Sequence, residues 1–326
     1  MENAIRHLLV HCGGMRAGER VLVVADETTA SLAQAFVRCA EAAGGIAALA
    51  SIPAAQSHGE EPTGVVAARM LESDLVLGLT RMSLAHTQAR LAASQRGTRY
   101  LSLPGYSAEL LSDPCVMADF RAQYFLTRAV TEAFTAGSTV RVATRAGTDL
   151  QLQIGGRSGN CCPGFVDEHH LLGSPPDIES NVSPLEDRSE GVIVVDGSIA
   201  CNEIGLLSSP VVLTVEGGRI VDVNGEDAEV VDRVRRLFER VGDDKAYVLA
   251  ECGVGLNPLA QLTGAMLTDE GALGCVHFGF GSNSTVGGMN KVSFHVDFVV
   301  RQASLWVDEQ PVLLDGRPCI AGSQHA

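Results

Sequence analysis

The sequence Val21-Leu-Val-Val24 opens an alternation of short apolar runs and helical segments that decides the fold of the N-terminal part of the chain. Short apolar runs bounded by turn residues predict buried strands, and the amphipathic stretches between them predict helices. Further strands are expected at Ile46 to Ile52, Asp74 to Leu79 and Arg99 to Leu103, and helices at Ser31 to Ala43, Val65 to Leu71 and Ala85 to Gln95. Strands that alternate with helices in this way predict a doubly wound, mostly parallel sheet.

The residues after the first strand argue against a dinucleotide site. Such a site needs a G-x-G-x-x-G loop at this point, and the chain has Asp26-Glu27 instead. We therefore expect residues 1–125 to form a Rossmann-like α/β domain whose sheet has a structural role.

The pattern changes after a helix expected at Phe120 to Thr135. Short strands and glycine-containing turns such as Gly217-Gly218 follow, and they predict antiparallel hairpins. The strand candidates are Thr139 to Thr144, Leu150 to Ile154, Gly191 to Val195, Val211 to Val215 and Arg219 to Val223. One amphipathic helix is expected at Ala228 to Val241. Residues 126–326 are thus predicted to be a mixed α/β domain rich in antiparallel sheet, and this domain holds the candidate catalytic residues.

Composition restricts the class of partner. The chain has 39 Asp and Glu against 24 Lys and Arg, a formal net charge of -15, which disfavours nucleic acid and anionic membrane surfaces. No apolar run has secretory or transmembrane length, and the nine cysteines do not form the spaced pairs of a disulfide framework. These features predict a cytoplasmic protein with a small-molecule or peptide substrate. The last residues, Gly322 to Ala326, are predicted to be a disordered tail.

The densest group of reactive side chains lies near the C-terminus. In His295-Val-Asp297 one apolar residue separates an imidazole from a carboxylate, and the alternation of a strand puts both on one face. His277 ends a strand candidate upstream, and the glycines between His277 and His295 allow backbone to pass close to an ion. Two histidines and a carboxylate suit non-haem Fe(II) or catalytic Zn²⁺.

Two glutamates accompany this group. Glu251 ends the apolar run Ala246 to Ala250, where a carboxylate is costly unless charge or hydrogen bonds compensate it. Glu179 lies in an acidic, proline-rich loop, Pro175 to Asp187. Either glutamate alone would be typical of a solvated surface residue.

Taken in order, these residues resemble a known group. They are similar to the metal-binding half of the thermophilic metallo-aminopeptidases of the T and S type. The matching positions are Glu179, Glu251-Cys-Gly-Val-Gly-Leu-Asn-Pro258, His277 and Gly287-Gly-Met-Asn-x-x-x-x-His295-x-Asp297. The resemblance covers roughly residues 140–300. It implies that the metal ligands are Glu179, Glu251, His277, His295 and Asp297.

One departure from the peptidase pattern bears on the reaction. The aminopeptidases have a tyrosine seven residues after the histidine that matches His277, whereas this chain has Ser284. That tyrosine belongs to the two-metal peptidase site. Its replacement argues against a peptidase mechanism with two metal ions.

A second branch of the same superfamily contains 2,5-dihydroxypyridine 5,6-dioxygenase, a mononuclear Fe(II) enzyme. This chain is similar to that branch in its shorter length and in having histidines outside the metal site. The resemblance implies that His86 and His169 or His170 act on an aromatic substrate, and that Ser284 shapes the coordination sphere. Without the resemblance, His86 could cap a helix and the His169-His170 pair could lie on a surface loop.

Three functions follow from these observations. The favoured one is a mononuclear Fe(II) ring-cleaving dioxygenase that takes O₂ and a small hydroxylated N-heteroaromatic compound such as a dihydroxypyridine. The alternative is an aminopeptidase or a small amide or lactam hydrolase, in which one or two Zn, Co or Mn ions activate water and Glu179 or Glu251 is the general base. The third is a metal-dependent binding protein without catalysis. Because relatives are oligomeric and the chain is apolar overall, a homo-oligomer is expected.

Overall fold

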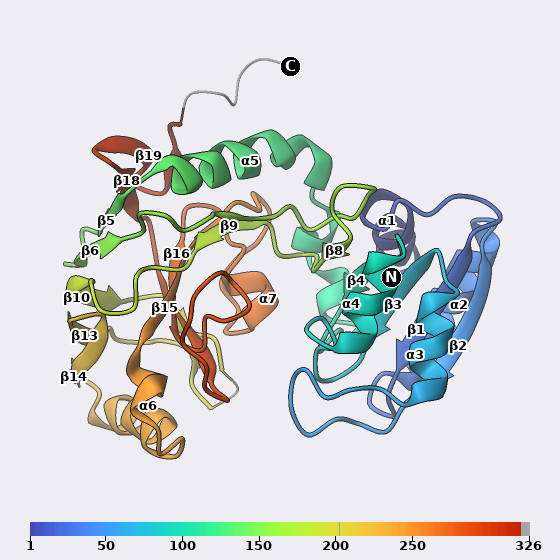
Figure 1. Cartoon of the computed structure of the whole chain (residues 1–326), viewed down its shortest axis with the longest axis horizontal. Coiled ribbons are helices and arrows are strands. Elements are labelled where there is room, and N and C mark those ends of the chain that lie inside the picture. The colour runs from blue at the N-terminus through green and yellow to red at the C-terminus, as the bar shows by residue number, and fades with distance from the viewer. Residues whose placement is uncertain (202, 321–326) are drawn as a thin grey trace. The chain divides into compact units, whose positions relative to one another are not determined.

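The computed structural model describes residues 1–201 and 203–320, and all elements given below belong to this part of the chain (Figure 1). The predicted tail, Gly322 to Ala326, lies outside the described residues. The chain divides into two compact units. The first contains residues 1–121 and 163–176, and the second contains residues 122–162 and 177–326.

The first unit is built on a parallel sheet, here called sheet A, with the strand order β2-β1-β3-β4-β8. Its strands are β1 (Arg20–Ala25), β2 (Ile46–Ser51), β3 (Leu75–Leu79), β4 (Arg99–Ser102) and β8 (Leu172–Gly173). Its helices are α1 (Glu2–His7), which continues as a π-helical turn over Leu8–Cys12, α2 (Ala30–Ala42), α3 (Gly64–Leu71) and α4 (Gln88–Gln95), with 3₁₀ turns at Leu110–Ser112 and Pro114–Met117.

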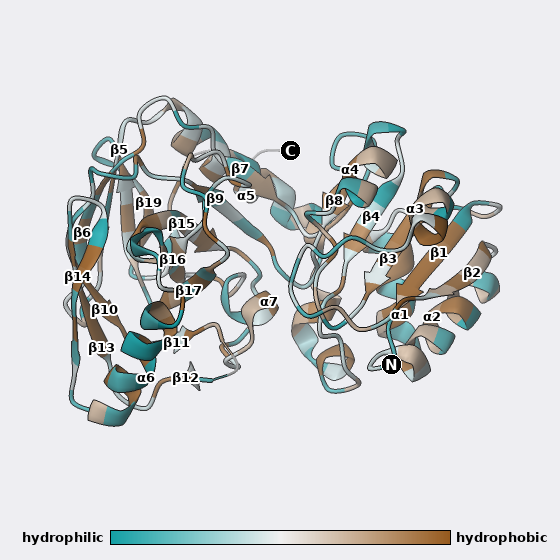
Figure 2. Cartoon of the chain, turned by 60° about the horizontal axis from the view of Figure 1, so that its bottom comes forward, coloured by the Kyte–Doolittle hydropathy of each residue, from teal (hydrophilic) through white to brown (hydrophobic). Residues whose placement is uncertain are grey.

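Helices cover both faces of sheet A, as a doubly wound fold requires. Leu22 and Val24 of β1 pack with Val66 of α3 and Ala93 of α4 on one face. The alternate residues of the strands point to the other face, where α2 packs against β1 and β2 and α1 packs against α2 (Figure 2). After the exposed Arg20, every residue of β1 is hydrophobic and buried, as expected for a strand covered on both faces. The predicted doubly wound sheet is confirmed.

At the end of β1 an internal carboxylate joins two loops. Asp26 is buried and accepts hydrogen bonds from the Thr28 amide at 2.9 Å and from the Arg81 amide at 2.6 Å. Arg81 follows β3, so Asp26 ties together the turns at the point where the strand order reverses, the usual ligand crevice of such sheets.

The second unit contains two antiparallel sheets. Sheet B has the strand order β14-β13-β10-β6-β5-β18-β19-β20, and sheet C has the order β12-β11-β17-β16-β15-β9-β7. The strands of sheet B are β5 (Thr139–Ala143), β6 (Asp149–Gln153), β10 (Glu190–Val195), β13 (Val211–Glu216), β14 (Arg219–Gly225), β18 (Ser304–Val307), β19 (Gln310–Leu314) and β20 (Arg317–Pro318). Those of sheet C are β7 (Asn160–Cys162), β9 (Glu179–Val182), β11 (Ser198–Ile199), β12 (Gly205–Leu206), β15 (Leu249–Gly255), β16 (Val276–Gly281) and β17 (His295–Val300).

Helices pack against these sheets. They are α5 (Phe120–Ala136), α6 (Ala228–Glu239) and α7 (Met266–Asp269), with a 3₁₀ turn at Asp244–Tyr247. Phe238 of α6 is buried against Phe280 and Phe298, which lie on one face of sheet C. The opposite face of sheet C carries the polar residues described below. The prediction of a C-terminal part rich in antiparallel sheet is confirmed.

Two boundaries differ from the sequence-based expectation. The chain changes unit after residue 121, close to the boundary expected near residue 125, but it changes again after residues 162 and 176 because β8 pairs with β4 and places residues 163–176 in the first unit. Helix α4 begins at Gln88 rather than at Ala85, because the Thr87 hydroxyl accepts a hydrogen bond from the Arg90 amide and caps the helix there.

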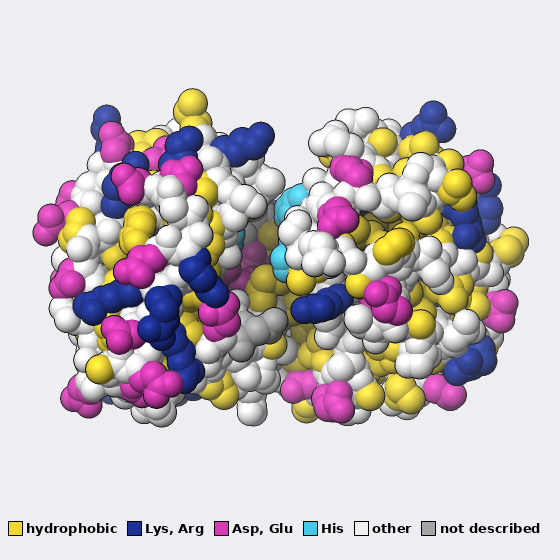
Figure 3. Space-filling view, turned by 90° about the horizontal axis from the view of Figure 1, so that it is seen from below, with side chains coloured by type: hydrophobic (Ala, Val, Ile, Leu, Met, Phe, Trp, Pro, Cys, Tyr) yellow, Lys and Arg dark blue, Asp and Glu magenta, His cyan; other side chains and the backbone are white. Residues whose placement is uncertain are grey.

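Acidic and basic side chains are interspersed over the surface face shown in Figure 3. Among the described cysteines no disulfide is formed. In the described part of the chain, no helix combines the length and the apolar character needed to cross a bilayer.

Candidate metal centre

Four neighbouring strands of sheet C carry the polar cluster. Glu179 comes from β9, Glu251 from β15, His277 from β16, and His295 and Asp297 from β17. Three of these positions differ from the sequence-based expectation: Glu179 begins a strand rather than lying in a loop, Glu251 lies inside β15 rather than at its end, and His277 is the second residue of β16 rather than the end of a strand. The side chains therefore project from sheet C, whose hydrogen bonds hold their backbone in place, and Glu251 directly follows a register shift between β15 and β16.

Glycines lie opposite the cluster on the adjacent strands. Gly253 is the cross-strand partner of His277, and a Cβ atom at Gly253 would lie 2.0 Å from His277 Nε2. Gly279 lies between Glu251 and Asp297 on its two neighbouring strands, and a Cβ atom there would lie 2.7 Å from the His295 ring. Because these positions have no side chain, the larger polar groups can converge over the sheet.

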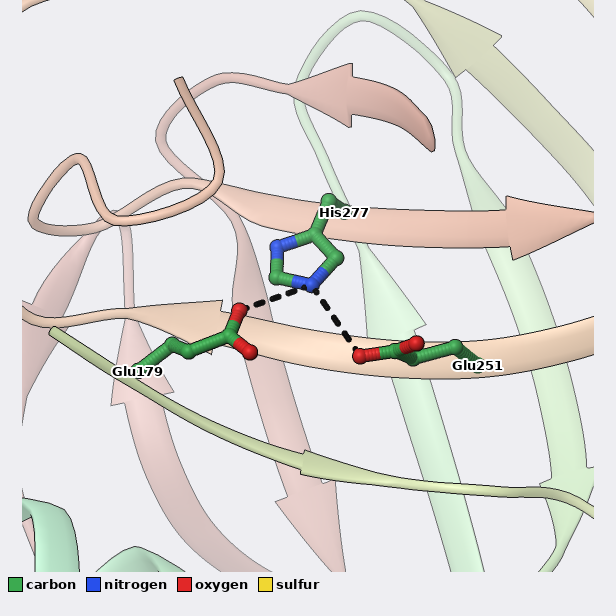
Figure 4. Close-up of side chains that lie close together, drawn as sticks. All are labelled: Glu179, Glu251 and His277. Carbon is green, nitrogen blue, oxygen red and sulfur yellow. Dashed lines mark ion pairs between the residues drawn. The ribbon is translucent and has the colours of Figure 1, made fainter. Parts of the chain in front are cut away.

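The side chains form two groups of three residues that share one member. Glu179, Glu251 and His277 offer ligand atoms that lie within 4.8 Å of one another, and so do Glu251, His295 and Asp297. His277 Nε2 lies 3.1 Å from Glu179 Oε2 and 3.7 Å from Glu251 Oε1, and both carboxylates point toward the imidazole (Figure 4). Imidazole nitrogen and carboxylate oxygen are the donor atoms that catalytic Fe(II), Zn²⁺ and Mn²⁺ sites use.

The second group contains two ligands from one strand, His295 and Asp297 of β17, together with Glu251. His295 Nε2 lies 3.2 Å from Asp297 Oδ1 and 3.5 Å from Glu251 Oε2. His295 Nδ1 lies 2.9 Å from the Ser282 carbonyl oxygen, which can only accept, so Nδ1 carries a proton. The Nε2 atom therefore faces the carboxylates.

Buried carboxylates lie close together in the cluster, and their negative charge shifts the pKa values of its members. Burial by itself would lower the pKa of His295, but the Asp297 and Glu251 carboxylates outweigh it and raise that pKa to about 10. The same pairing moves the pKa of the Asp297 carboxyl well below its usual range although burial opposes this. Burial raises the pKa of Glu251, and the neighbouring Glu179 adds to the effect. A divalent cation would relieve this repulsion.

Two carboxyl groups that sequence reasoning missed adjoin the cluster. Burial, together with the charge of Glu179, raises the pKa of Asp177 well above its usual range. Burial and Asp297 do the same for Glu270, whose side chain hydrogen-bonds to Asp297. Asp177 precedes Glu179 by two residues, a spacing that could have indicated it, whereas Glu270 is brought in only by the fold of the segment before β16.

Neighbouring side chains orient the candidate ligands. Asn181 Nδ2 donates to Glu179 Oε1 at 2.7 Å, which leaves the other carboxylate oxygen toward His277. Within the described residues, His277 Nδ1, Asp177 Oδ1 and Glu270 Oε1 are buried without a hydrogen-bond partner. Buried polar atoms normally have a hydrogen-bond partner. Buried atoms without one, in a cluster of five carboxyl groups and two imidazoles, fit a site that binds a cation.

The other sequence-predicted site residues lie elsewhere in the chain. The exposed Ser284 belongs to the loop after β16, and its hydroxyl lies 3.3 Å from the Ser282 hydroxyl. His86, His169 and His170 belong to the first unit. His86 and His169 are exposed, and the half-buried His170 places Nδ1 3.3 Å from Asp167 Oδ1 and its ring edge against Phe165.

Comparison with known proteins agrees with this architecture. A curated protein, 2,5-dihydroxypyridine 5,6-dioxygenase of Pseudomonas putida KT2440, is 27% identical over 267 residues, which are 78% of this chain and 74% of that protein. The solved structure of 2,5-dihydroxypyridine dioxygenase from the same organism matches with a TM-score of 0.84 at 21% identity, over 99% of this chain and 98% of the other.

A second solved structure shows the same fold at greater distance. Wild-type AmpT from Thermus thermophilus matches with a TM-score of 0.66 at 15% identity, over 98% of both chains. This likeness agrees with the aminopeptidase resemblance of the metal-binding half. The family model described as 2,5-dihydroxypyridine 5,6-dioxygenase matches residues 1–320, almost the whole chain, and the protein therefore belongs to this enzyme family.

Proposed function

We propose that this protein is a non-haem Fe(II) dioxygenase that cleaves the ring of a small hydroxylated N-heteroaromatic compound such as a dihydroxypyridine. The family match over residues 1–320 carries the proposal. The cluster of Glu179, Glu251, His277, His295 and Asp297 supports it, since its donor atoms and charge fit a divalent ion. An Fe(II) ion held there would supply the one-electron chemistry that lets O₂ react with an electron-rich ring.

The residues of the cluster bind and orient. One of the two groups reaches the solvent. It contains His295, whose side chain is 33% exposed, together with Asp297 and Glu251, whose carboxylates are at most 8% exposed. His277 and Glu179 of the other group are buried. We assign the ion to these five side chains and substrate access to the side of His295.

Proton handling falls to histidines outside the cluster. An imidazole nitrogen can accept or donate a proton, so His86, His169 or His170 is suited to accept the proton of a ring hydroxyl or to hydrogen-bond to it. In this proposal Ser284 adjoins the site through Ser282, whose carbonyl accepts from His295. Replacing each histidine with alanine should separate a substrate-handling role, seen in KM and kcat, from ion binding.

The arrangement also favours a second candidate function. Because Glu251 belongs to both three-residue groups, the cluster could hold two ions that share one carboxylate. Two ions would suit a hydrolase in which Glu179 or Glu251 acts as general base on water. The fold shared with AmpT is compatible with this alternative.

One experiment distinguishes the two reactions. Protein purified without oxygen is analysed for bound metals, then assayed for O₂ uptake on hydroxypyridines, 2,5-dihydroxypyridine included, and for amine release from small peptides. One iron per chain with O₂ uptake that needs the ring compound supports the dioxygenase. Two zinc, cobalt or manganese ions with peptide cleavage and no O₂ uptake would overturn it in favour of the hydrolase.

A further inference from the structure

His295 differs from the other candidate ligands in how it is held. The side chains of Glu179, Glu251, His277 and Asp297 are 2–8% exposed, so packing restricts them, whereas that of His295 is 33% exposed. Packing alone does not fix its ring. Its Nδ1–H donates to the Ser282 carbonyl at 2.9 Å, and this bond leaves Nε2 as the atom that faces the carboxylates. The position of Ser282 therefore decides how His295 is presented.

Ser282 begins the loop that joins β16 to β17, and a buried amide organises this loop from inside. Asn283 is fully buried, and its Oδ1 accepts from the Asn290 amide at 2.7 Å. Its Nδ2 donates to Ser183 Oγ at 2.9 Å and to Glu186 Oε1 at 3.0 Å. Gly288 makes room for it, because a Cβ atom at Gly288 would lie 2.0 Å from Asn283 Cγ.

Asn290 ties the same loop to the adjacent sheet. Its Nδ2 donates to the Gly281 carbonyl at 2.6 Å and to the Lys245 carbonyl at 2.8 Å. Gly281 is the cross-strand partner of His295, so this amide holds the strand end directly beside the histidine.

A half-buried ion pair anchors the loop to other parts of the second unit. Glu186 Oε1 accepts from the Met289 amide at 2.7 Å, and Glu186 Oε2 pairs with Arg157 at 2.6 Å. Arg157 in turn donates to the Gly287 carbonyl at 2.6 Å. The ion pair thus holds the loop at Gly287 and at Met289, and its side chains are only 11% and 27% exposed.

We propose that Arg157, Glu186, Asn283 and Asn290, here called the loop clasp, are positioning residues for the metal centre. The clasp keeps the Ser282 carbonyl over His295 Nδ1 and so holds the ring with Nε2 toward Glu251 and Asp297. This inference rests on the proposed function, since it concerns the same site. The motif Gly287-Gly-Met-Asn290 thereby serves to close the loop on Asn283, rather than to bring backbone to the ion.

The test measures ion affinity in variants of the clasp. Co(II) alone is titrated by calorimetry into wild-type protein and into Glu186→Ala, Glu186→Gln and Asn283→Ala, and the visible absorption of bound Co(II) reports its coordination geometry. Groups bonded directly to a ligating histidine typically contribute about 10–100-fold to metal affinity, and here that group is the Ser282 carbonyl. Because the clasp acts through this carbonyl, Glu186→Ala and Asn283→Ala should bind Co(II) more weakly, by up to about 10–100-fold, with an altered spectrum. Glu186→Gln keeps an acceptor oxygen for Met289 and should lose less.

The matched control is Glu19→Ala. Glu19 pairs with Arg99 at 2.5 Å with side chains 20% and 12% exposed, and it also accepts from the Arg16 amide, so it resembles Glu186 in burial and in bonding. It belongs to the first unit. This control should lose stability while keeping wild-type Co(II) affinity and spectrum.

Hydrogen exchange of the loop amides in the metal-free proteins provides a second measurement. Loss of protection over residues 282–294 in Glu186→Ala, together with weaker Co(II) binding, supports the clasp. Wild-type affinity in all three clasp variants, with circular dichroism showing that they fold, overturns this inference alone. A wild-type protein that binds no divalent ion overturns the proposed function and the clasp with it.

Discussion

Two glycines leave the space that the side chains of the candidate metal centre occupy. His277 faces Gly253, and Glu251 and Asp297 converge over Gly279. Neither glycine has the positive φ that would by itself require glycine, so the constraint is room rather than backbone conformation. A methyl group at either position would enter the volume of an imidazole.

The first prediction concerns Gly279→Ala. The new Cβ atom would lie 2.7 Å from the His295 ring and 2.9 Å from Asp297 Oδ1, so these side chains must move apart. We expect divalent-ion affinity, measured by calorimetry, to fall at least about tenfold, in line with other displaced ligand partners. Gly64→Ala is the control, because a Cβ atom at this helical position meets open space, and its affinity should be that of the wild type. Unchanged affinity in Gly279→Ala would contradict the site.

The second prediction concerns pH. The pKa of His295, about 10 in the folded protein, lies above the usual imidazole value of 6.5, so the protonated ring stabilises the metal-free protein. This stabilisation is complete below pH 6.5 and is lost as pH rises to about 10. Urea denaturation of metal-free protein should show stability falling across this window, and His295→Ala should lack that part of the fall. Ion affinity should rise over the same window, since binding displaces the proton.

At the scale of elements, sheet C has polar side chains on one face and apolar side chains on the other. One face carries the polar cluster, and the other carries Phe280 and Phe298, which pack against Phe238 of α6. Alternation along β16 and β17 produces this division. The apolar face holds the strands in register, and the register in turn sets which side chains meet on the polar face.

The third prediction tests the apolar face. Phe238 is 1% exposed and touches four other rings, so Phe238→Ala should lower the free energy of unfolding by about 3–5 kcal/mol. Protein that remains folded should bind the ion with nearly wild-type affinity, because the deleted side chain lies on the opposite face of the sheet. Phe125→Ala is the control: its ring is 47% exposed and its loss should cost under about 1 kcal/mol. Chemical denaturation measures both, and equal effects of the two changes would refute this account of the core.

At the scale of the whole molecule, all five candidate ligands belong to the second unit. Residues 163–176 belong to the first unit, where β8 completes sheet A. The second unit resumes at Asp177, two residues before Glu179. The first unit has its own core around sheet A, and none of the five candidate ligands belongs to it.

The fourth prediction follows from this division. An ion that binds only the folded state stabilises it by about 2.7 kcal/mol at a hundred times its Kd, which corresponds to a rise in Tm of roughly 5–10 °C for a unit of this size. Hydrogen exchange with and without chelator should place the gain of protection in β9, β15, β16 and β17. An equal gain across sheet A would show that the ion is not confined to these strands.

The sequence by itself determined the class of fold and the identity of the polar cluster. Apolar runs such as Val21 to Val24 predict a doubly wound sheet because strands buried on both faces need no polar alternation. His295 and Asp297 could be paired from a spacing of two, which any strand converts into a shared face. Glu251 and Glu179 became candidate ligands through the ordered motif that resembles the metallo-aminopeptidases.

Only the tertiary structure decided how these residues meet. The register of β9, β15, β16 and β17 brings together side chains more than a hundred positions apart, and it depends on non-local packing that periodicity does not report. Glu270, the place of Gly253 opposite His277 and the clasp around Asn283 were missed for the same reason. Their roles come from cross-strand and loop contacts, which have no signature within a short stretch of sequence.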